Sequence, residues 1–174
     1  MPQNGWLDIN DWDAIKTVNN DTSGLWFFNS CPLAGASQPH RHIQLLRRGI
    51  NEIICPRHEW FLNFEKCKIN KKLFKNIIVK SFDFSSDIKN IYDIYIELSK
   101  NIGLGDPLID KKPKKPYNLL ITNHWIALIK RTNDKIYGFS VNGLGFAGYL
   151  LVTEKSDTRY LKLKGPENLL ENFV

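Results

Sequence analysis

Hydrophobic and polar residues recur along this chain with two periods, which predict a sheet covered by helices. Apolar residues fall three or four positions apart in residues 8–18 and 86–101, which is the spacing of amphipathic helices. They alternate with polar residues, or form short runs, in residues 25–29, 74–84 and 118–130, as strands do. The last of these segments predicts two strands that meet at a turn. The pattern therefore predicts an α+β domain.

Shorter segments complete the predicted order of elements. Residues 58–64 predict a short helix, and residues 135–141 a further strand. Residues 149–152 also have strand character, whereas the pattern from Ser156 onwards is helical, with a glycine as a stop. Residues 111–116 consist of lysine and proline, so they form neither a helix nor a central strand. A solvated connector is the favoured interpretation, over a phosphate-steering arm or a nucleic-acid patch.

A row of polar side chains lies within the predicted strand that follows Pro39. Side chains on a strand alternate between its faces, so one face carries His40, His42 and Gln44, and the other carries Arg41, Ile43 and Leu45. Because an unpaired buried polar group costs about 1–3 kcal/mol, this row indicates a site. Paired histidines on a strand can also be ordinary hydrogen-bonded core groups, and that alternative holds for the pair taken alone.

The loop before this strand is suited to binding an anion. Gly35 and Ala36 are small, so backbone N–H groups from Gly35 to Ser37 can approach a phosphate, while Ser37 and Gln38 add a hydroxyl and an amide as donors. Asn29, at the end of the preceding strand, can bind a ribose or phosphate, or simply end the strand. The sequence therefore predicts a phosphate site beside an imidazole.

Two later stretches bear on the same site. Asn118 and Thr122 share one face of a predicted strand, as two nucleotide-contacting groups would. The glycine-rich stretch 142–148 is not a dinucleotide fingerprint, because its spacing is wrong and a strand-like segment follows it. Its glycines instead let the backbone pack closely near the site. His124, at the predicted turn, is expected to be exposed and structural rather than catalytic.

Composition limits the cellular compartments and the binding partners to be expected. A chain of 174 residues is long enough for one domain with a substantial core, and no apolar run approaches the roughly 20 residues of a membrane helix. The net charge of +6 favours polyanionic partners, or reflects solvated lysine-rich faces. The cysteines form no CxxC pair, which favours a reducing cytosol. We expect scattered thiols rather than a zinc site made of Cys55, His58 and Cys67.

Residues 35–44 read Gly-Ala-Ser-Gln-Pro-His-Arg-His-Ile-Gln. This segment resembles the active-site segment of the ATP adenylyltransferases, also called diadenosine tetraphosphate phosphorylases. They form the His-x-His-x-Gln transferase branch of the histidine-triad superfamily. Residues 117–122 followed by Trp125, and residues 142–148, also agree with this branch in order and spacing.

The resemblance implies a histidine-triad-like antiparallel sheet with flanking helices, in one nucleotidyltransferase domain that spans residues 1–174. It implies that His42 is the nucleophile, that the backbone of His40 orients it, and that Gln44 stabilises the phosphate. Phosphorolysis of diadenosine tetraphosphate to ATP and ADP, and the reverse adenylyl transfer, would pass through adenylyl-His42. The residues expected to bind the nucleotide are Asn29, Gly35, Ala36, Ser37, Gln38, Asn118 and Thr122.

The resemblance also implies the partners. ATP, ADP, diadenosine tetraphosphate and phosphate are expected as substrates, with no resident cofactor, although Mg²⁺ can accompany the nucleotide; neither a membrane nor nucleic acid is expected. An N-terminal portion that adds strands and a phosphate-contacting lysine in family members is expected to be missing, which would open a sheet edge and favour a homodimer. The alternatives are a nucleotide-binding remnant without turnover, or a related histidine-triad hydrolase or uridylyltransferase.

Overall fold

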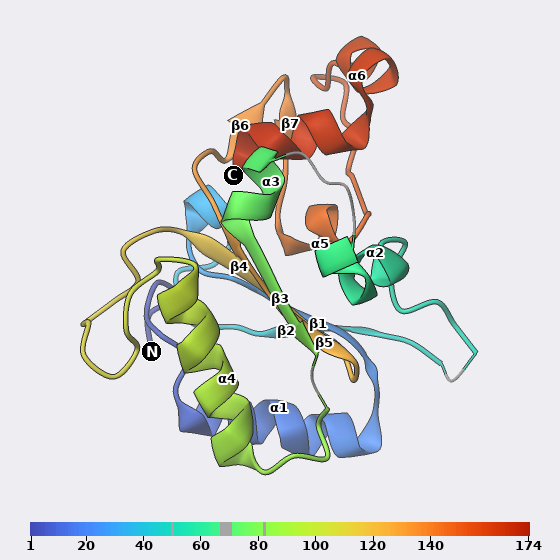
Figure 1. Ribbon diagram of the computed structural model, residues 1–174. Coiled ribbons are helices and arrows are strands. Elements are labelled where there is room, and N and C mark those ends of the chain that lie inside the picture. The colour runs from blue at the N-terminus through green and yellow to red at the C-terminus, as the bar shows by residue number, and fades with distance from the viewer. Residues whose placement is uncertain (50, 67–70, 82) are drawn as a thin grey trace.

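A five-stranded antiparallel sheet in the order β2-β1-β4-β5-β3 runs through the middle of the protein (Figure 1). The computed structural model describes residues 1–49, 51–66, 71–81 and 83–174. In chain order the elements are α1 (Ile9–Asp21), β1 (Gly24–Asn29), the 3-10 turn η1 (Pro32–Ala34), β2 (Gln44–Arg47), α2 (His58–Leu62), η2 (Phe64–Lys66), α3 (Lys71–Asn76), β3 (Ile77–Ser81), α4 (Ile88–Asn101), β4 (Tyr117–Ile121), β5 (Trp125–Lys130), β6 (Lys135–Ile136), β7 (Phe139–Ser140), α5 (Gly143–Phe146), α6 (Thr158–Leu170) and η3 (Glu171–Phe173).

The two faces of the sheet bury two separate cores. Trp26 and Phe28 point toward α1 and α4, which lie together on one side of the sheet in Figure 1. Leu25 and Phe27, one position out of phase, point to the other side, where α2, α5 and the C-terminal segment cover them. The alternation along β1 thus assigns each apolar side chain to a face. The expected α+β architecture, an antiparallel sheet with flanking helices, is confirmed.

Helix α1 begins where its sequence can satisfy the free N–H groups of a first turn. The Asp8 carboxylate accepts hydrogen bonds from the N–H groups of Asn10 and Asp11, at 2.9 and 3.4 Å. The Asp11 carboxylate accepts from the Asp8 N–H at 2.8 Å, which completes a capping box. The predicted helix over residues 8–18 is therefore present and extends to Asp21.

Three segments differ from the pattern-based predictions. Residues 135–141 form a small hairpin, β6 and β7, rather than one strand, because Tyr137 and Gly138 both take positive φ and turn the chain. Residues 149–152 are irregular, with Leu151 and Val152 exposed, and they pair with none of the strands that the structure describes. The predicted strand over residues 74–84 starts as the end of α3 and becomes β3 only at Ile77; residue 82 lies outside the described residues.

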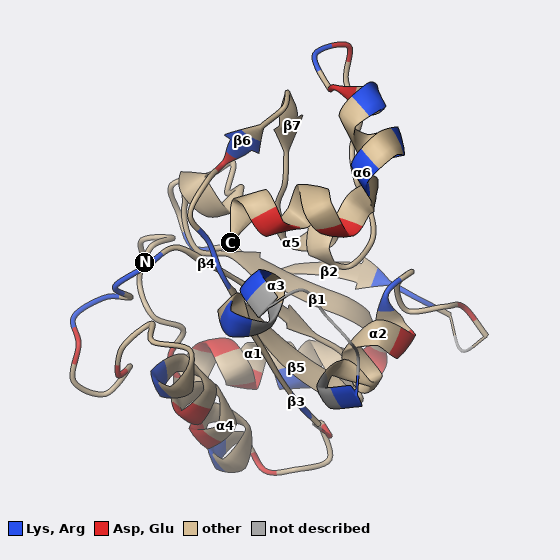
Figure 2. Ribbon diagram, turned by 45° about the horizontal axis from the view of Figure 1, so that its top comes forward, with Lys and Arg blue, Asp and Glu red and all other residues tan. Residues whose placement is uncertain are grey.

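Charged residues are spread over the surface rather than collected on one element. Figure 2 shows basic residues on α3, α6 and β6, and acidic residues on neighbouring elements. The lysine-rich segment 111–116 is an irregular connection, as expected. Across the described ranges, none of the helices combines the length and apolarity needed to cross a bilayer. Both outer strands, β2 and β3, have one edge that no other described strand of the sheet covers.

Helix α2 is attached to β5 through a histidine. Trp125 Nε1 donates a hydrogen bond to His58 Nδ1 at 3.1 Å, and the Phe61 ring stacks on Trp125 with the centroids 4.4 Å apart. Burial and the His124 ring, 5.6 Å away, lower the pKa of His58, while Glu59 opposes this shift. Because Nδ1 accepts the hydrogen bond, His58 must be neutral for this contact to exist.

Replacing His58 by Gln tests this attachment, since a glutamine oxygen can still accept from Trp125 but does not titrate. The His58 pKa is lower in the folded protein, so the unfolded chain binds more protons once the pH falls below about 6.5. We therefore expect the native protein to lose stability on acidification more steeply than His58→Gln. Urea denaturation followed by circular dichroism at about pH 7.5 and about pH 5.5 measures the two slopes, and equal slopes would contradict the assignment.

Candidate functional site

The two histidines after Pro39 lie together just before β2. Their ring centroids are 5.8 Å apart, and His42 Nδ1 lies 3.1 Å from the backbone oxygen of His40. A carbonyl oxygen can only accept, so this contact places the imidazole proton on Nδ1 and leaves the lone pair of a neutral ring on Nε2. The contact that the resemblance implies is therefore present. Its catalytic meaning stays a prediction.

The strand that carries the histidines differs from the continuous strand expected. Regular pairing between β1 and β2 ends at Phe27 and Gln44, and residues 41–43 lie outside β2. Instead, His40 forms an isolated antiparallel bridge with Pro2, and the Arg41 N–H donates to the Met1 oxygen at 3.0 Å. The N-terminal residues replace β1 as the partner here, so the two strands separate where the histidines emerge.

Arg41 fixes the opposite face of this segment to the rest of the protein. Its Nη1 contacts Asp11 at 2.6 Å and Asp8 at 3.3 Å, and its Nη2 donates to the Trp6 oxygen at 2.6 Å. The side chains of Arg41 and Asp11 are only 10% and 16% exposed, so this ion pair is shielded from water and its screening by salt is weak. The capping box of α1 therefore also holds the back of the segment that presents His42.

The loop of residues 31–38 supplies fewer backbone donors than the sequence predicts. The Gly35 N–H donates to Pro32 and the Ala36 N–H to Cys31, because residues 32–34 turn as a 3-10 helix. These two N–H groups are therefore already used. Ser37 and Gln38 are exposed, and in the described part of the chain their side chains make no hydrogen bond. Donors for an anion come chiefly from these two residues.

Gly35 serves close packing as well as the turn. Its φ is 87°, and a Cβ placed there would lie 2.6 Å from Asn142 Cβ and 2.8 Å from Asn142 Cα. Asn142 in turn caps α5, since its Oδ1 accepts from the N–H groups of Leu144 and Gly145. The loop and the glycine-rich stretch 142–148 are thus in close backbone contact at Gly35 and Asn142.

A buried network of amides lies beneath the loop, and it contains two residues expected to contact the nucleotide. Asn29 Oδ1 accepts from Asn118 Nδ2 at 2.7 Å and from the Gly143 N–H at 2.9 Å. Asn118 Nδ2 also donates to the Ala34 oxygen, and Asn118 Oδ1 accepts from Arg131 Nη1, both at 2.7 Å. Asn29 is 3% exposed and Asn118 is fully buried. Direct nucleotide contact is therefore not supported for these two residues; their amides position the loop from below.

Thr122 also differs from the expectation of nucleotide contact. It is fully buried, and its Oγ1 accepts hydrogen bonds from the N–H groups of His124 and Trp125, at 3.1 and 3.2 Å. A threonine hydroxyl in this arrangement stabilises a tight turn. Thr122 therefore closes the hairpin between β4 and β5, while His124 at the tip is exposed, as predicted.

Sequence reasoning missed two residues that organise the site, Gln3 and Arg131. Arg131 is fully buried, and its guanidinium donates to backbone oxygens of Ala34, Asn133 and Phe173 in addition to Asn118. Burial lowers its pKa to about 10. It makes no ion pair with a carboxylate of the described residues. A lone arginine after an apolar strand carries no signal of this role in one sequence.

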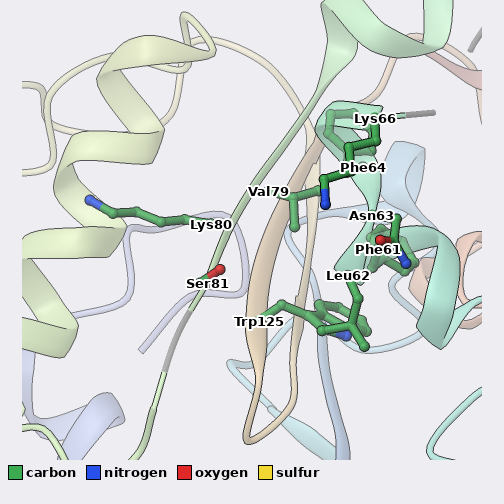
Figure 3. A pocket seen from close by; sticks show the side chains of 9 residues that line it. All are labelled: Phe61, Leu62, Asn63, Phe64, Lys66, Val79, Lys80, Ser81 and Trp125. Atoms are coloured by element: carbon green, nitrogen blue, oxygen red, sulfur yellow. The ribbon is translucent and has the colours of Figure 1, made fainter. Parts of the chain in front are cut away.

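The pocket of about 330 Å³ drawn in Figure 3 lies elsewhere. Phe61 and Trp125 line it from one side, with Val79, Lys80 and Ser81 of β3 along the other. Because β3 and β2 are the two outer strands of the sheet, this pocket lies at the opposite edge from His42. It does not belong to the site formed by the histidines and the loop.

The described residues contain no group of three or more His, Cys, Asp or Glu side chains arranged to hold a metal ion. Cys67, one of the ligands considered for zinc, lies outside the described residues. Cys55 is buried, and this burial raises the pKa of its thiol to about 11. Such a thiol stays protonated at neutral pH and is a poor nucleophile and metal ligand.

Two family models match the chain. The ATP adenylyltransferase C-terminal domain matches residues 68–174, and the Ap4A phosphorylase N-terminal domain matches residues 1–54. From Saccharomyces cerevisiae, Protein APA1 is 24% identical over 92% of this chain and 54% of its own length. Diadenosine 5',5'''-P1,P4-tetraphosphate phosphorylase 2 of the same organism is 24% identical over 75% of this chain and 45% of its own length. The chain thus spans about half the length of these curated relatives.

Solved structures show the same fold. Yeast Ap4A phosphorylase Apa2 in complex with AMP matches with a TM-score of 0.71 and 22% identity, over 98% of this chain and 64% of that one. The complex of the same yeast protein with Ap4A matches with a TM-score of 0.69 and 20% identity, over 99% and 63%. At this level of identity the likeness establishes the fold.

Gly35 and Gly103 offer a matched test of the close packing beneath the loop. Both have positive φ, but a Cβ at Gly103 meets nothing within 4 Å, so Gly103→Ala carries only the backbone cost of about 1–2 kcal/mol. Gly35→Ala adds the collision with Asn142, and we expect it to reduce the free energy of unfolding by a further 1–3 kcal/mol, roughly. Urea denaturation measures both losses. Equal losses would show that the loop does not depend on this contact.

Proposed function

The chain belongs to the ATP adenylyltransferase family, because the C-terminal domain model of that family matches more than half of its residues, and from this membership we propose that it transfers adenylyl groups through His42. The proposed reaction is phosphorolysis of diadenosine tetraphosphate to ATP and ADP, together with its reverse. The observation that carries the proposal is the 3.1 Å contact between His42 Nδ1 and the His40 oxygen. This contact directs the lone pair of a neutral imidazole away from the backbone.

In the first step His42 Nε2 attacks the phosphorus of an adenylyl group. A bond forms between nitrogen and phosphorus, while the bond from phosphorus to the bridging oxygen breaks. ATP leaves with that oxygen and its electron pair, and adenylyl-His42 remains. The Nδ1 proton stays hydrogen-bonded to the His40 oxygen throughout, which stabilises the positive charge that develops on the ring.

In the second step inorganic phosphate resolves the intermediate. A phosphate oxygen attacks the same phosphorus, the bond between nitrogen and phosphorus breaks, and the imidazole regains its lone pair. The product is ADP. The two steps together convert diadenosine tetraphosphate and phosphate into ATP and ADP, with no water consumed.

Negative charge on the non-bridging oxygens needs donors that are already in place. The exposed Ser37 hydroxyl and Gln38 amide can supply them. The Gln44 amide is a further donor; Gln44 follows His42 by two residues and lies on the face of the sheet that Phe27 occupies. The Arg131 guanidinium, bonded to Ala34 directly beneath this loop, adds a fixed positive charge. These groups would bind an oligophosphate without a resident metal, and Mg²⁺ would travel with the nucleotide.

The similarities support this substrate class. One relative is named as a diadenosine tetraphosphate phosphorylase, and the solved structures of the yeast protein hold AMP and Ap4A. The matched relatives are longer than this chain. Whether the chain alone catalyses the reaction therefore depends on what the additional part of those proteins contributes. A nucleotide-binding protein without turnover is the second candidate, favoured by the position of β2 at the edge of the sheet, where no other described strand pairs with its outer side.

We expect His42→Ala to abolish formation of a covalent adenylyl adduct, because the attacking nitrogen is removed. Incubation with radiolabelled diadenosine tetraphosphate, followed by denaturing electrophoresis, measures the adduct. His40→Ala keeps the backbone oxygen that orients His42, so it should reduce the adduct far less. His124→Ala, at the exposed hairpin tip, is the control that should label like the native protein. Undiminished labelling of His42→Ala would exclude this nucleophile.

Product analysis separates the proposed reaction from its alternatives. ADP that appears only with added phosphate supports phosphorolysis, whereas AMP without phosphate indicates a hydrolase, and a preference for UDP-sugars indicates a uridylyltransferase. Binding of diadenosine tetraphosphate in calorimetry, without an adduct or products, identifies the nucleotide-binding remnant. Parallel assays with Mg²⁺ and with a chelator determine whether the nucleotide needs the cation.

A further inference from the structure

We propose that Gln3 is a positioning residue for His42. The carboxamide of Gln3 is inserted between two strands and determines where the backbone of His42 lies. This inference rests on the proposed function of His42. Gln3 lies within no regular strand, yet it is 3% exposed and makes three hydrogen bonds. No feature of the sequence marks it as part of the site.

The register of the sheet shows what Gln3 replaces. Phe27 pairs with Gln44 in the antiparallel ladder of β1 and β2, so the same register would place His42 opposite Asn29. The ladder instead contains the Gln3 side chain at this position. Gln3 Oε1 accepts from the His42 N–H at 2.8 Å, and Gln3 Nε2 donates to the Asn29 oxygen at 2.6 Å.

A carboxamide is suited to this position because it carries an acceptor and a donor on one planar group. It can satisfy the N–H of one strand and the oxygen of the next while it holds them apart by its own width. The bond to the Asn29 oxygen is buried and the bond from the His42 N–H is partly buried, so leaving either backbone group unpaired would be costly. An apolar side chain of the same size would leave both without a partner.

The inserted amide also determines which way the histidine segment leaves the sheet. Because His42 does not bond directly to Asn29, residues 40 and 41 are free to pair with the N-terminal residues, through the bridge of His40 with Pro2. The Gln3 N–H donates to the Pro39 oxygen at 3.0 Å, which fixes the start of the same segment. With Arg41 attached to α1 on the opposite face, the backbone beside His42 is held from two sides.

Gln3→Met tests the proposal, because methionine has a similar volume but forms neither hydrogen bond. Ser30→Ala is the control: Ser30 follows β1 directly, is 2% exposed, and its Oγ accepts from the Tyr117 N–H at 2.8 Å. This change removes a buried bond to β4, on the other side of β1 from β2 and the histidines. Urea denaturation determines the loss of stability for each variant, so that activity is compared between equally folded samples.

Single-turnover labelling with diadenosine tetraphosphate gives the maximal rate of adduct formation and the half-saturating concentration. For Gln3→Met we expect the rate to fall at least about tenfold, with the half-saturating concentration changed less than about threefold, because the reacting nitrogen is displaced while the binding groups remain. Ser30→Ala should keep the rate within about threefold of the native protein. Equal rates for Gln3→Met and the native protein, or an equal fall in Ser30→Ala, would overturn the proposal.

A measurement independent of activity keeps the two proposals separable. In ¹⁵N NMR spectra the native His42 ring should show a protonated Nδ1 and an unprotonated Nε2, whereas Gln3→Met should show a mixture of the two tautomers, with Ser30→Ala unchanged. If the native protein forms no adduct but Gln3→Met shifts the tautomers, the proposed function fails and the positioning role stands. If the ring signals of Gln3→Met match those of the native protein, Gln3 does not position His42. Should Gln3→Met fail to fold, Gln3→Asn, which is too short to bridge both strands, takes its place with the same expectations.

Discussion

A buried guanidinium without an ion-paired carboxylate among the described residues must be solvated by oxygen atoms of the protein itself, and this requirement organises the region around Arg131. Its donors reach the backbone at Ala34, Asn133 and Phe173, and the Asn118 side chain. Those groups belong to the loop before the histidines, the turn after β5, the C-terminal segment and β4. A single charge therefore ties together segments that are far apart in the sequence. Removing it would leave several buried oxygens without donors, which is far more costly than losing one exposed hydrogen bond.

The two faces of the segment that contains His40, Arg41 and His42 are held by different groups. Arg41 and α1 hold one face by ion pairs, whereas Gln3 and the His40 oxygen set the backbone and ring of His42 on the other. Arg41 and His42 are adjacent in the sequence but have different roles, because successive residues of an extended segment point to opposite faces. Preorganisation of this kind matters for an imidazole nucleophile, because its ring must present one nitrogen in one direction.

The sequence predicted the elements whose apolar residues repeat with a clear period. Helices α1 and α4 and the hairpin of β4 and β5 are where the pattern places them, because each buries one well-defined face. The motif around His42 also led to the family. The predictions that failed have physical causes. Residues 149–152 have the composition of a strand, but a segment forms a strand only when a neighbouring strand pairs with it, and the sequence pattern does not reveal that neighbour. Residues 135–141 contain a turn at Tyr137 and Gly138 that interrupts an otherwise strand-like run.

The roles of individual side chains were harder to predict than the elements that carry them. Asn29, Asn118 and Thr122 are polar residues on strand ends beside the site, and one sequence cannot show whether such a side chain faces a ligand or a neighbouring amide. The backbone donors of Gly35 and Ala36 were lost to a 3-10 turn that begins with Pro32. Gln3 and Arg131 were missed because their partners lie dozens of residues away.

The place where the two matched regions meet has a consequence for how the protein is put together. Residues 1–54 contribute β1 and β2, residues 68–174 contribute β3, β4 and β5, and the boundary between them runs down the ladder of β1 with β4. Every residue of both strands is buried. Either half in isolation would expose to water the apolar faces and unpaired backbone amides of β1 or of β4. Each half therefore supplies the strand with which the other half pairs. A protease cut between residues 54 and 68 would sever the backbone and leave the sheet joined, as two fragments held in one noncovalent body.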